Sequence, residues 1–115
     1  MTTKDLIVHI KEKLEDKGFE VEMNSNDYAF ATKDGKSWRE EVKGYSYTDF
    51  FGYTIGIRTV HRHNGTDENK SVDMEIVKWN RGFGRRIAKE RLNVNFSEKQ
   101  IDNRINKIVE QYNNL

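Results

Sequence analysis

Residues 96–112 have the sequence FSEKQIDNRINKIVEQY, which is the clearest structural signal in the chain. Ser97 is followed three residues later by Gln100, and this pair forms a capping box in which each side chain accepts a hydrogen bond from the other residue's backbone N–H. Phe96 and Ile101 flank the cap and are placed to form a hydrophobic staple. An apolar stripe continues at helical spacing through Ile101, Ile105, Ile108, Val109 and Tyr112. The sequence therefore predicts a C-terminal helix that buries one face, with Ile105 and Ile108 in the core.

A second helix is predicted near the start of the chain, from about residue 4 to residue 17. Thr2 or Thr3 is a suitable N-cap, and Asp5 lies in the first turn, where the helix dipole favours an anion. Gly18 suits the left-handed position that commonly follows a helix. The apolar residues again recur at helical spacing, at Leu6, Ile7, Ile10 and Leu14.

Between these helices the apolar pattern changes to a period of two, which is typical of strands. Strands are predicted at residues 19–23, 28–32 and 38–43, within residues 45–62, and at residues 72–78. Asp34-Gly35 is a hairpin signal that would fold residues 38–43 back on residues 28–32. Residues 83–95 fit either a strand or a short helix. This order predicts one α+β domain over residues 1–115, an antiparallel sheet of four to five strands with the N-terminal and C-terminal helices packed on one face.

The composition excludes several classes of protein. Of the 115 residues, 35% are hydrophobic and 34% are charged, and the mean hydropathy is −0.94. The chain has no Cys, which excludes disulfides, a thiol nucleophile and Cys-based zinc sites. No run of about 18 apolar residues and no secretory leader is visible, so we expect a cytoplasmic protein without a membrane partner. The chain also lacks the glycine-rich phosphate motifs and the serine-nucleophile motif, so the sequence predicts no cofactor and no catalytic residue.

The charges balance over the whole chain but not locally. Residues 1–49 hold 8 basic and 11 acidic residues, whereas residues 50–115 hold 12 basic and 8 acidic residues. Most of the positive excess lies in residues 78–91, where six cations accompany only Glu90. Such a concentration indicates a surface for an acidic protein or a phosphate backbone, unless acidic residues of the first 49 fold against it. The candidate binding residues are Trp79, Arg81, Phe83, Arg85, Arg86, Lys89 and Arg91.

Four of these candidates, residues 79, 81, 83 and 85, alternate between aromatic and basic. If the segment is extended, they share one face and form a stacking platform flanked by cations, which suits single-stranded nucleic acid. The alternative is a turn at residues 80–82 that places Trp79 and Phe83 in the core and leaves the arginines in water. The sequence leaves both interpretations open.

Glu41-Val42-Lys43 matches the E-x-K part of a nuclease signature. Residues 19–43 resemble the PD-(D/E)XK nucleases, and the resemblance implies that Glu41 shares a divalent ion with an upstream carboxylate, Asp27 or Asp34. Those nucleases usually continue into a helix, whereas residues 45–62 predict a strand. A Mg²⁺-dependent nuclease is therefore a second alternative, and we expect no nuclease activity.

Two further motifs are incomplete. His61 and His63 would share one face of a strand and could bind zinc if His9, Asp67 or Asp73 joined them, but two ligands are too few to predict a metal site. Residues 86–94 followed by residues 97–112 resemble a helix-turn-helix whose spacing is imperfect. Its second helix would present three cations to a DNA groove, Lys99, Arg104 and Lys107.

The second half of the chain combines FGYTIGIR at residues 51–58, His63-Asn64, a strand ending near Ile76-Val77, LNVNF at residues 92–96 and the closing helix. This order, over about the last 65 residues, resembles certain anti-CRISPR proteins of phages that infect Gram-positive bacteria. The resemblance implies a non-enzymatic inhibitor of a Cas9-type effector. The chain departs from one such family because it lacks a strongly basic N-terminal arm.

The sequence thus predicts a small, phage-borne binding protein that inhibits a host defence protein or nucleoprotein complex. A nucleic-acid-binding protein that uses residues 78–91 is the first alternative, and the nuclease is the second.

Overall fold

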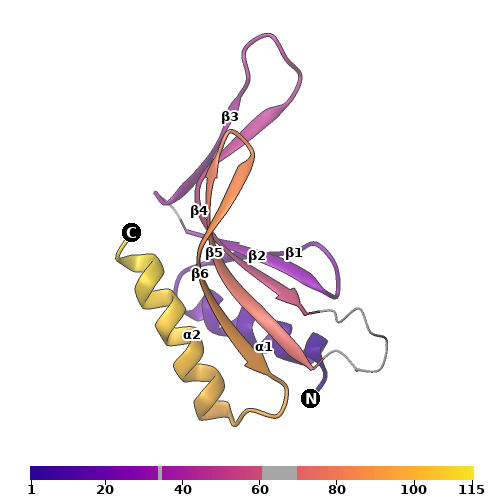
Figure 1. Ribbon diagram of the computed structural model, residues 1–115. Coiled ribbons are helices and arrows are strands. Elements are labelled where there is room, and N and C mark those ends of the chain that lie inside the picture. Colours follow the sequence, from indigo (N-terminus) through magenta and orange to yellow (C-terminus); the bar gives the residue numbers. More distant parts are fainter. Residues whose placement is uncertain (34, 61–69) are drawn as a thin grey trace.

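A computed structural model describes residues 1–33, 35–60 and 70–115 of the chain. The elements follow in the order α1 (Thr3–Asp16), β1 (Glu20–Met23), β2 (Tyr28–Thr32), β3 (Ser37–Glu41), β4 (Thr48–Thr59), β5 (Ser71–Asn80), β6 (Phe83–Asn93) and α2 (Glu98–Asn113). The predicted α+β class with two terminal helices is confirmed (Figure 1). In the described part of the chain the antiparallel sheet has six strands rather than four or five. No helix there is long and apolar enough to cross a membrane.

Both helices begin at capping boxes. At α1, Asp5 N donates to Thr2 Oγ1 at 3.1 Å, and Thr2 N donates to Asp5 Oδ2 at 3.0 Å. At α2, the Ser97 and Gln100 bonds are 3.2 and 2.8 Å long. Each box satisfies two backbone N–H groups that a helix start leaves unpaired. The predicted start of the C-terminal helix is therefore confirmed, and Thr2 rather than Thr3 caps the first helix.

The two helices lie on the same face of the sheet and enclose the core. The predicted stripes of both helices are buried, Ile105 and Ile108 included. Tyr112 closes one end of the core because its ring packs on Phe19 at 5.0 Å and its hydroxyl donates to Tyr53 O at 2.9 Å. Burial raises the pKa of Tyr112 to about 12. The sheet contributes Ala29, Ala31, Ile55, Ile57, Val72, Met74, Ile76 and Leu92 to this core.

The strand order is β1-β2-β4-β5-β6, and β3 pairs with β4 outside this path. The expected hairpin between residues 28–32 and 38–43 is wrong, because both segments pair with β4 instead. Ala29 lies opposite Ile57, whereas Trp38 lies opposite Phe51. At 12 residues β4 is long enough to pair with one strand along each half. Asp34, on which the hairpin expectation rested, lies outside the described residues.

The first half of β4 carries the sheet beyond the helices. Together with β3 and the end of the β5–β6 hairpin it forms a projection, here called the arm, which comprises residues 36–52 and 78–85 (Figure 1). Gly52 lies where the arm joins the rest of the sheet and has a φ of +95°. A Cβ atom at Gly52 would clash with the backbone carbonyl of Lys36, so this close crossing requires glycine.

Residues 83–93 form strand β6, so the helix-turn-helix interpretation is wrong for its first helix. β6 pairs with β5 from Asn93 opposite Ser71 to Phe83 opposite Asn80. The register shifts where Ala88 and Arg86 pair with consecutive residues of β5, which is the geometry of a β-bulge at Ile87. The bulge interrupts the two-residue alternation, which explains why the sequence pattern was ambiguous here.

Candidate interaction surface on the arm and the open sheet face

Residues 78–91 form the end of β5, a tight turn and most of β6. Arg81 and Gly82 both have positive φ, 52° and 79°, as a two-residue hairpin turn of the primed type requires. The expected turn at residues 80–82 is therefore present. The predicted stacking platform is wrong, because the turn separates its members. Trp79 lies opposite Gly84 on one face of the hairpin, while Phe83 and Arg85 lie on the other.

Trp79 is half-buried on the sheet face that the helices leave open. Its indole Nε1 donates to Thr54 Oγ1 at 2.9 Å, and its ring meets Phe50 edge-on with centroids 6.1 Å apart. A Cβ atom at Gly84 would come within 3.0 Å of the indole, so glycine leaves the room that this ring occupies. Trp79 therefore has a fixed orientation.

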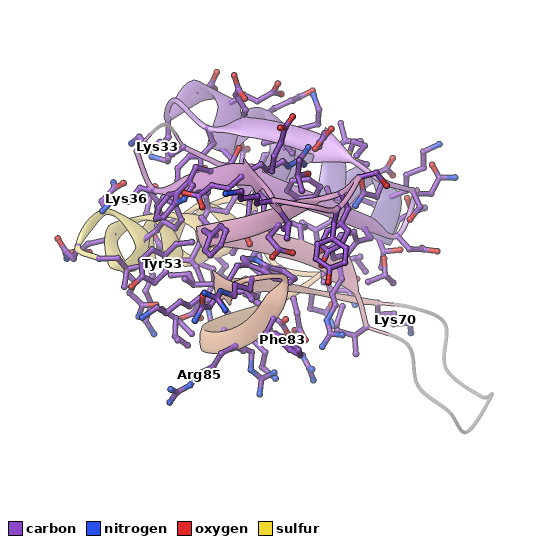
Figure 2. All side chains as sticks on the ribbon, turned by 90° about the horizontal axis from the view of Figure 1, so that it is seen from above. Lys33, Lys36, Tyr53, Lys70, Phe83 and Arg85 are labelled. Atoms are coloured by element: carbon purple, nitrogen blue, oxygen red, sulfur yellow. The ribbon has the colours of Figure 1, made fainter. Side chains whose placement is uncertain are left out.

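Phe83 has the opposite environment. The residue is 82% exposed, so the alternative that placed it in the core is wrong. Figure 2 shows the β5–β6 hairpin from its end, with Arg85 extending away from the rest of the molecule. Lys78, across the ladder from Arg85, lies 5.9 Å from the Tyr53 ring centroid.

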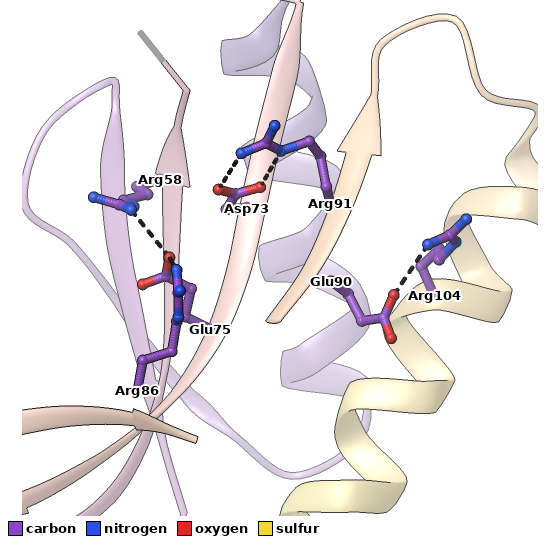
Figure 3. Close-up of polar contacts among 7 residues, drawn as sticks. All are labelled: Arg58, Asp73, Glu75, Arg86, Glu90, Arg91 and Arg104. Carbon is purple, nitrogen blue, oxygen red and sulfur yellow. Dashed lines mark hydrogen bonds and ion pairs between the residues drawn. The ribbon is translucent and has the colours of Figure 1, made fainter. Parts of the chain in front are cut away.

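Two of the candidate cations are held by carboxylates within the sheet. Arg91 Nε and Nη2 donate to the two oxygens of Asp73 at 2.8 and 3.1 Å, and Asp73 is 1% exposed. These hydrogen bonds, with the charge of Asp73, raise the pKa of Arg91. Arg86 lies 3.4 Å from Glu75, which also binds Arg58 at 3.0 Å (Figure 3). The neutralising carboxylates come from β5 and not, as one alternative proposed, from residues 1–49.

The other cations of the segment face solvent. Within the described residues, no carboxylate forms an ion pair with Arg81, Arg85 or Lys89. The sequence candidates therefore divide between two faces of the hairpin, and only part of the positive charge is available to a partner.

The arm also exposes aromatic residues that the sequence analysis did not single out. Trp38, Tyr45 and Tyr47 are each at least half exposed. Trp38 stacks on Phe51 with centroids 6.0 Å apart, and Tyr45 packs on Tyr47 at 5.3 Å in the loop between β3 and β4. The density of aromatic residues in this part of the sequence was a usable signal, but residues 45–62 predicted only that a strand lies within them. With Phe83, these residues place four large exposed rings on the arm.

Of the nuclease candidates, Asp34 lies outside the described residues, and Asp27 and Glu41 are far apart. Glu41 lies opposite Thr48 at the start of β4, whereas Asp27 O accepts a hydrogen bond from Thr59 N at its end. Lys43 lies in the loop at the tip of the arm. Within residues 1–33, 35–60 and 70–115, no group of three His, Asp or Glu side chains could hold a metal ion.

Four of the remaining motif residues, all in the described part of the chain, have structural partners. His61, His63 and Asp67 lie outside the described residues, and the two other proposed zinc ligands are engaged elsewhere. His9 lies 3.4 Å from Asp102 between the helices, and Asp73 binds Arg91. Two of the proposed groove-facing cations, Arg104 and Lys107, instead bind the buried Glu90 of β6, at 3.1 and 2.9 Å.

A hollow of about 240 Å³ opens on the sheet face opposite the helices, at the base of the arm. Its wall is mainly aromatic. The lining residues are Asn24, Tyr28, Phe30, Arg39, Phe50, Thr54, Trp79 and Gly82.

No model of a protein family, no curated protein and no solved structure matches the chain. The function is therefore inferred from the chemistry that the fold exposes, namely the aromatic arm and the open face of the sheet.

Proposed function

We propose that the protein is a small non-enzymatic binding protein whose arm contacts a host protein or nucleoprotein complex in the host cytoplasm. The observation that carries this proposal is the group of exposed rings on the arm, Trp38, Tyr45, Tyr47 and Phe83. Exposed apolar patches commonly mark interaction sites, and large aromatic side chains dominate binding energy when a partner covers them.

The charges around these rings favour an acidic partner surface. Arg81 and Arg85 flank Phe83 in the sequence and, among the described residues, have no ion-pair partner. Arginine beside an exposed ring is a common composition of an interface anchor, because the guanidinium makes several hydrogen bonds at once. The arm can therefore combine apolar burial with charge pairing.

A narrower form of the proposal follows from the resemblance of residues 51–58 and 92–96 to anti-CRISPR proteins. In this form the partner is a guide-loaded Cas9-type effector, and the protein inhibits it by occupying a surface, which requires no catalytic group. The separation of Asp27 from Glu41 argues against the alternative of a nuclease.

The test compares three proteins in DNA cleavage assays with a panel of purified Cas9-type effectors from Gram-positive bacteria. These are the wild type, the triple variant Tyr45→Ser, Tyr47→Ser, Phe83→Ser, and Val8→Ser as a control with an exposed apolar residue on α1. We expect inhibition by the wild type and the control, and about a 100-fold weaker effect of the triple variant, as the loss of anchor residues implies.

If the wild-type protein inhibits none of the effectors in the panel, the narrower form of the proposal is wrong. A pull-down from host lysate, with and without nuclease treatment, tests the general form. If the triple variant captures the same proteins as the wild type, the arm is not the contact surface and the general proposal is wrong.

A further inference from the structure

The sheet face opposite the helices carries four aromatic side chains from three strands. Tyr28 and Phe30 belong to β2, Phe50 to β4 and Trp79 to β5, and all four line the hollow at the base of the arm. None of the four is fully buried, since no described element covers this face. The rings therefore present apolar surface to solvent beside an open cavity.

The hollow has the size of one ring system. Its volume of about 240 Å³ lies below the range of about 300–1,000 Å³ that is usual for whole drug-sized ligands. Its wall is also preorganised, because the hydrogen bond to Thr54 and the contact with Gly84 fix the indole of Trp79. A rigid aromatic wall favours a flat occupant that stacks or packs edge-on against it.

Polar groups surround the apolar wall. Asn24 and Tyr28 line the hollow, and the Arg39 guanidinium lies 5.5 Å from the Phe50 ring centroid. Burial raises the pKa of Tyr28 and the neighbouring Glu75 carboxylate adds to this effect, so the hydroxyl remains a donor. An aliphatic side chain could not bond to the polar groups of Asn24 and Tyr28, whereas a nucleobase offers both a ring face and a hydrogen-bonding edge.

Cations continue along the same face from the hollow. Arg58 and Arg86 share the single carboxylate of Glu75, and Lys89 lies opposite Glu75 in the ladder. Glu75 is four residues from Trp79 along β5, about 13 Å at 3.3 Å per residue. These three cations and one carboxylate leave positive charge within reach of a chain that begins in the hollow.

We propose that the open face of the sheet binds single-stranded nucleic acid, with one base in the hollow beside Trp79 and Phe50 and the following phosphates along Arg58, Arg86 and Lys89. This site uses none of the four exposed rings that carry the proposed function, so either proposal can fail without the other. The sequence predicted a nucleic-acid surface on residues 78–91 alone, whereas the surface proposed here is shared by β2, β4, β5 and β6.

The experiment measures fluorescence anisotropy of labelled single-stranded DNA and RNA 8-mers, each with an abasic counterpart. We expect intact oligonucleotides to bind and abasic ones to bind about 10-fold more weakly, because stacking is lost. Raising the salt concentration tenfold, from about 50 mM, lowers the affinity about 25-fold if two phosphates are contacted. Comparison of the DNA and RNA oligonucleotides shows whether the 2′-hydroxyl contributes to the affinity.

The chain offers matched controls on its two faces. Phe50→Leu removes a ring from the hollow, whereas Phe51→Leu removes the neighbouring ring, also half-buried, on the other face. We expect about 10-fold weaker binding for Phe50→Leu and no change for Phe51→Leu. Arg86→Gln should likewise weaken binding and make it less dependent on salt, whereas Arg85→Gln, on the opposite face, should leave the affinity unchanged.

Thermal melts establish that each variant is folded. If Phe50→Leu does not fold, quenching of Trp79 emission by the oligonucleotide in a Trp38→Phe background replaces it as the measure of stacking. The proposal is overturned if no intact oligonucleotide binds at low salt, if abasic and intact strands bind equally, or if the members of each control pair behave alike. Binding of an acidic peptide with a central Phe, in place of any oligonucleotide, overturns it as well.

Discussion

Strand β4 belongs to two different regions, and its halves differ in what holds them. Its second half, from residue 53 to residue 59, lies under the helices and is buried at most positions, with Ile55 and Ile57 in the core. Its first half, from residue 48 to residue 52, lies in the arm, where only Gly52 is buried. The same backbone pairing thus continues from a covered face to an uncovered one.

This difference shows how the arm can remain ordered while it exposes aromatic rings. Aromatic pairs such as Trp38–Phe51 and Phe50–Trp79 replace the helices there as packing partners. Such pairs contribute about 0.5–1.5 kcal/mol each beyond the area that they bury, whereas truncating a buried aliphatic residue costs about 2–5 kcal/mol. The body should therefore determine the global stability, and the arm should determine recognition.

The strongest test of this division compares two identical substitutions. Ile105→Ala, in the core under α2, should lower the free energy of unfolding by about 2–5 kcal/mol because it leaves a cavity. Ile87→Ala, at the bulge of β6 with a side chain that is 42% exposed, should change it by about 0.5 kcal/mol or less. Urea denaturation measures both, and comparable losses would show that the bulge of β6, which adjoins the arm, is part of the cooperative core.

A smaller effect is expected where the two regions join. Gly52→Ala introduces a side chain at a positive φ and against the Lys36 carbonyl, and should cost about 2–3 kcal/mol while displacing β3. Gly44→Ala is the control, since its φ of +87° is equally unfavourable but open space surrounds its Cβ position. We expect a loss of about 1 kcal/mol there. Thermal melts measure the loss of stability, and the near-ultraviolet circular dichroism signal of Trp38 reports the displacement of β3. Equal effects of Gly52→Ala and Gly44→Ala would contradict a close crossing at Gly52.

The smallest change in stability is expected for Glu90, whose carboxylate connects β6 to α2 through ion pairs with Arg104 and Lys107. Burial alone would raise the pKa of Glu90, but hydrogen bonds and charges from Lys107 and Arg104 outweigh this effect and lower the pKa below the usual value for a glutamate. The folded-state pKa is thus below the unfolded one, so this stabilisation is complete above the unfolded value and is lost as the pH falls through the folded value. Glu90→Gln should cost about 1 kcal/mol at neutral pH and make stability less dependent on pH in the acidic range.

The matched control for Glu90 is Glu22→Gln. Glu22 is exposed, and its Oε2 lies 3.9 Å from Arg39, so the pair should contribute little to the free energy of unfolding. Denaturation curves at neutral and acidic pH compare the two variants with the wild type. A Glu90→Gln protein with the pH dependence of the wild type would show that the contacts with α2 do not stabilise the fold.

The fold was predictable where the determining contacts are local. The capping boxes at Thr2 and Ser97 connect residues three apart, so the sequence displays them directly. The pairing of β3 was not predictable, because the local Asp-Gly signal competes with a long strand that begins further along the chain. β6 was ambiguous because the bulge at Ile87 interrupts its alternation, and its charges find partners only across the ladder, such as Asp73 opposite Arg91.

The candidate surface was predictable in position but not in orientation. Residues 78–91 do form an exposed hairpin, yet a turn with two positive φ angles separates Trp79 from Phe83. Composition cannot show that Tyr45 and Tyr47 precede β4 rather than belong to its core half. The hollow was not predictable from the sequence, since its lining residues are scattered between positions 24 and 82 and meet only through strands that are not consecutive in the chain.

The two-part character of β4 has a consequence for the exchange of its backbone amides with solvent. Amides from Ile55 to Ile57 are flanked by β2 and β5 and lie beneath the helices, so they should open only when the whole domain unfolds. Those of Thr48 to Phe51 have β3 on one side and few helical contacts, so local opening suffices to expose them. Protection from deuterium should therefore rise along a single strand, and a partner bound to the arm would slow exchange at the end that is fastest in the free protein.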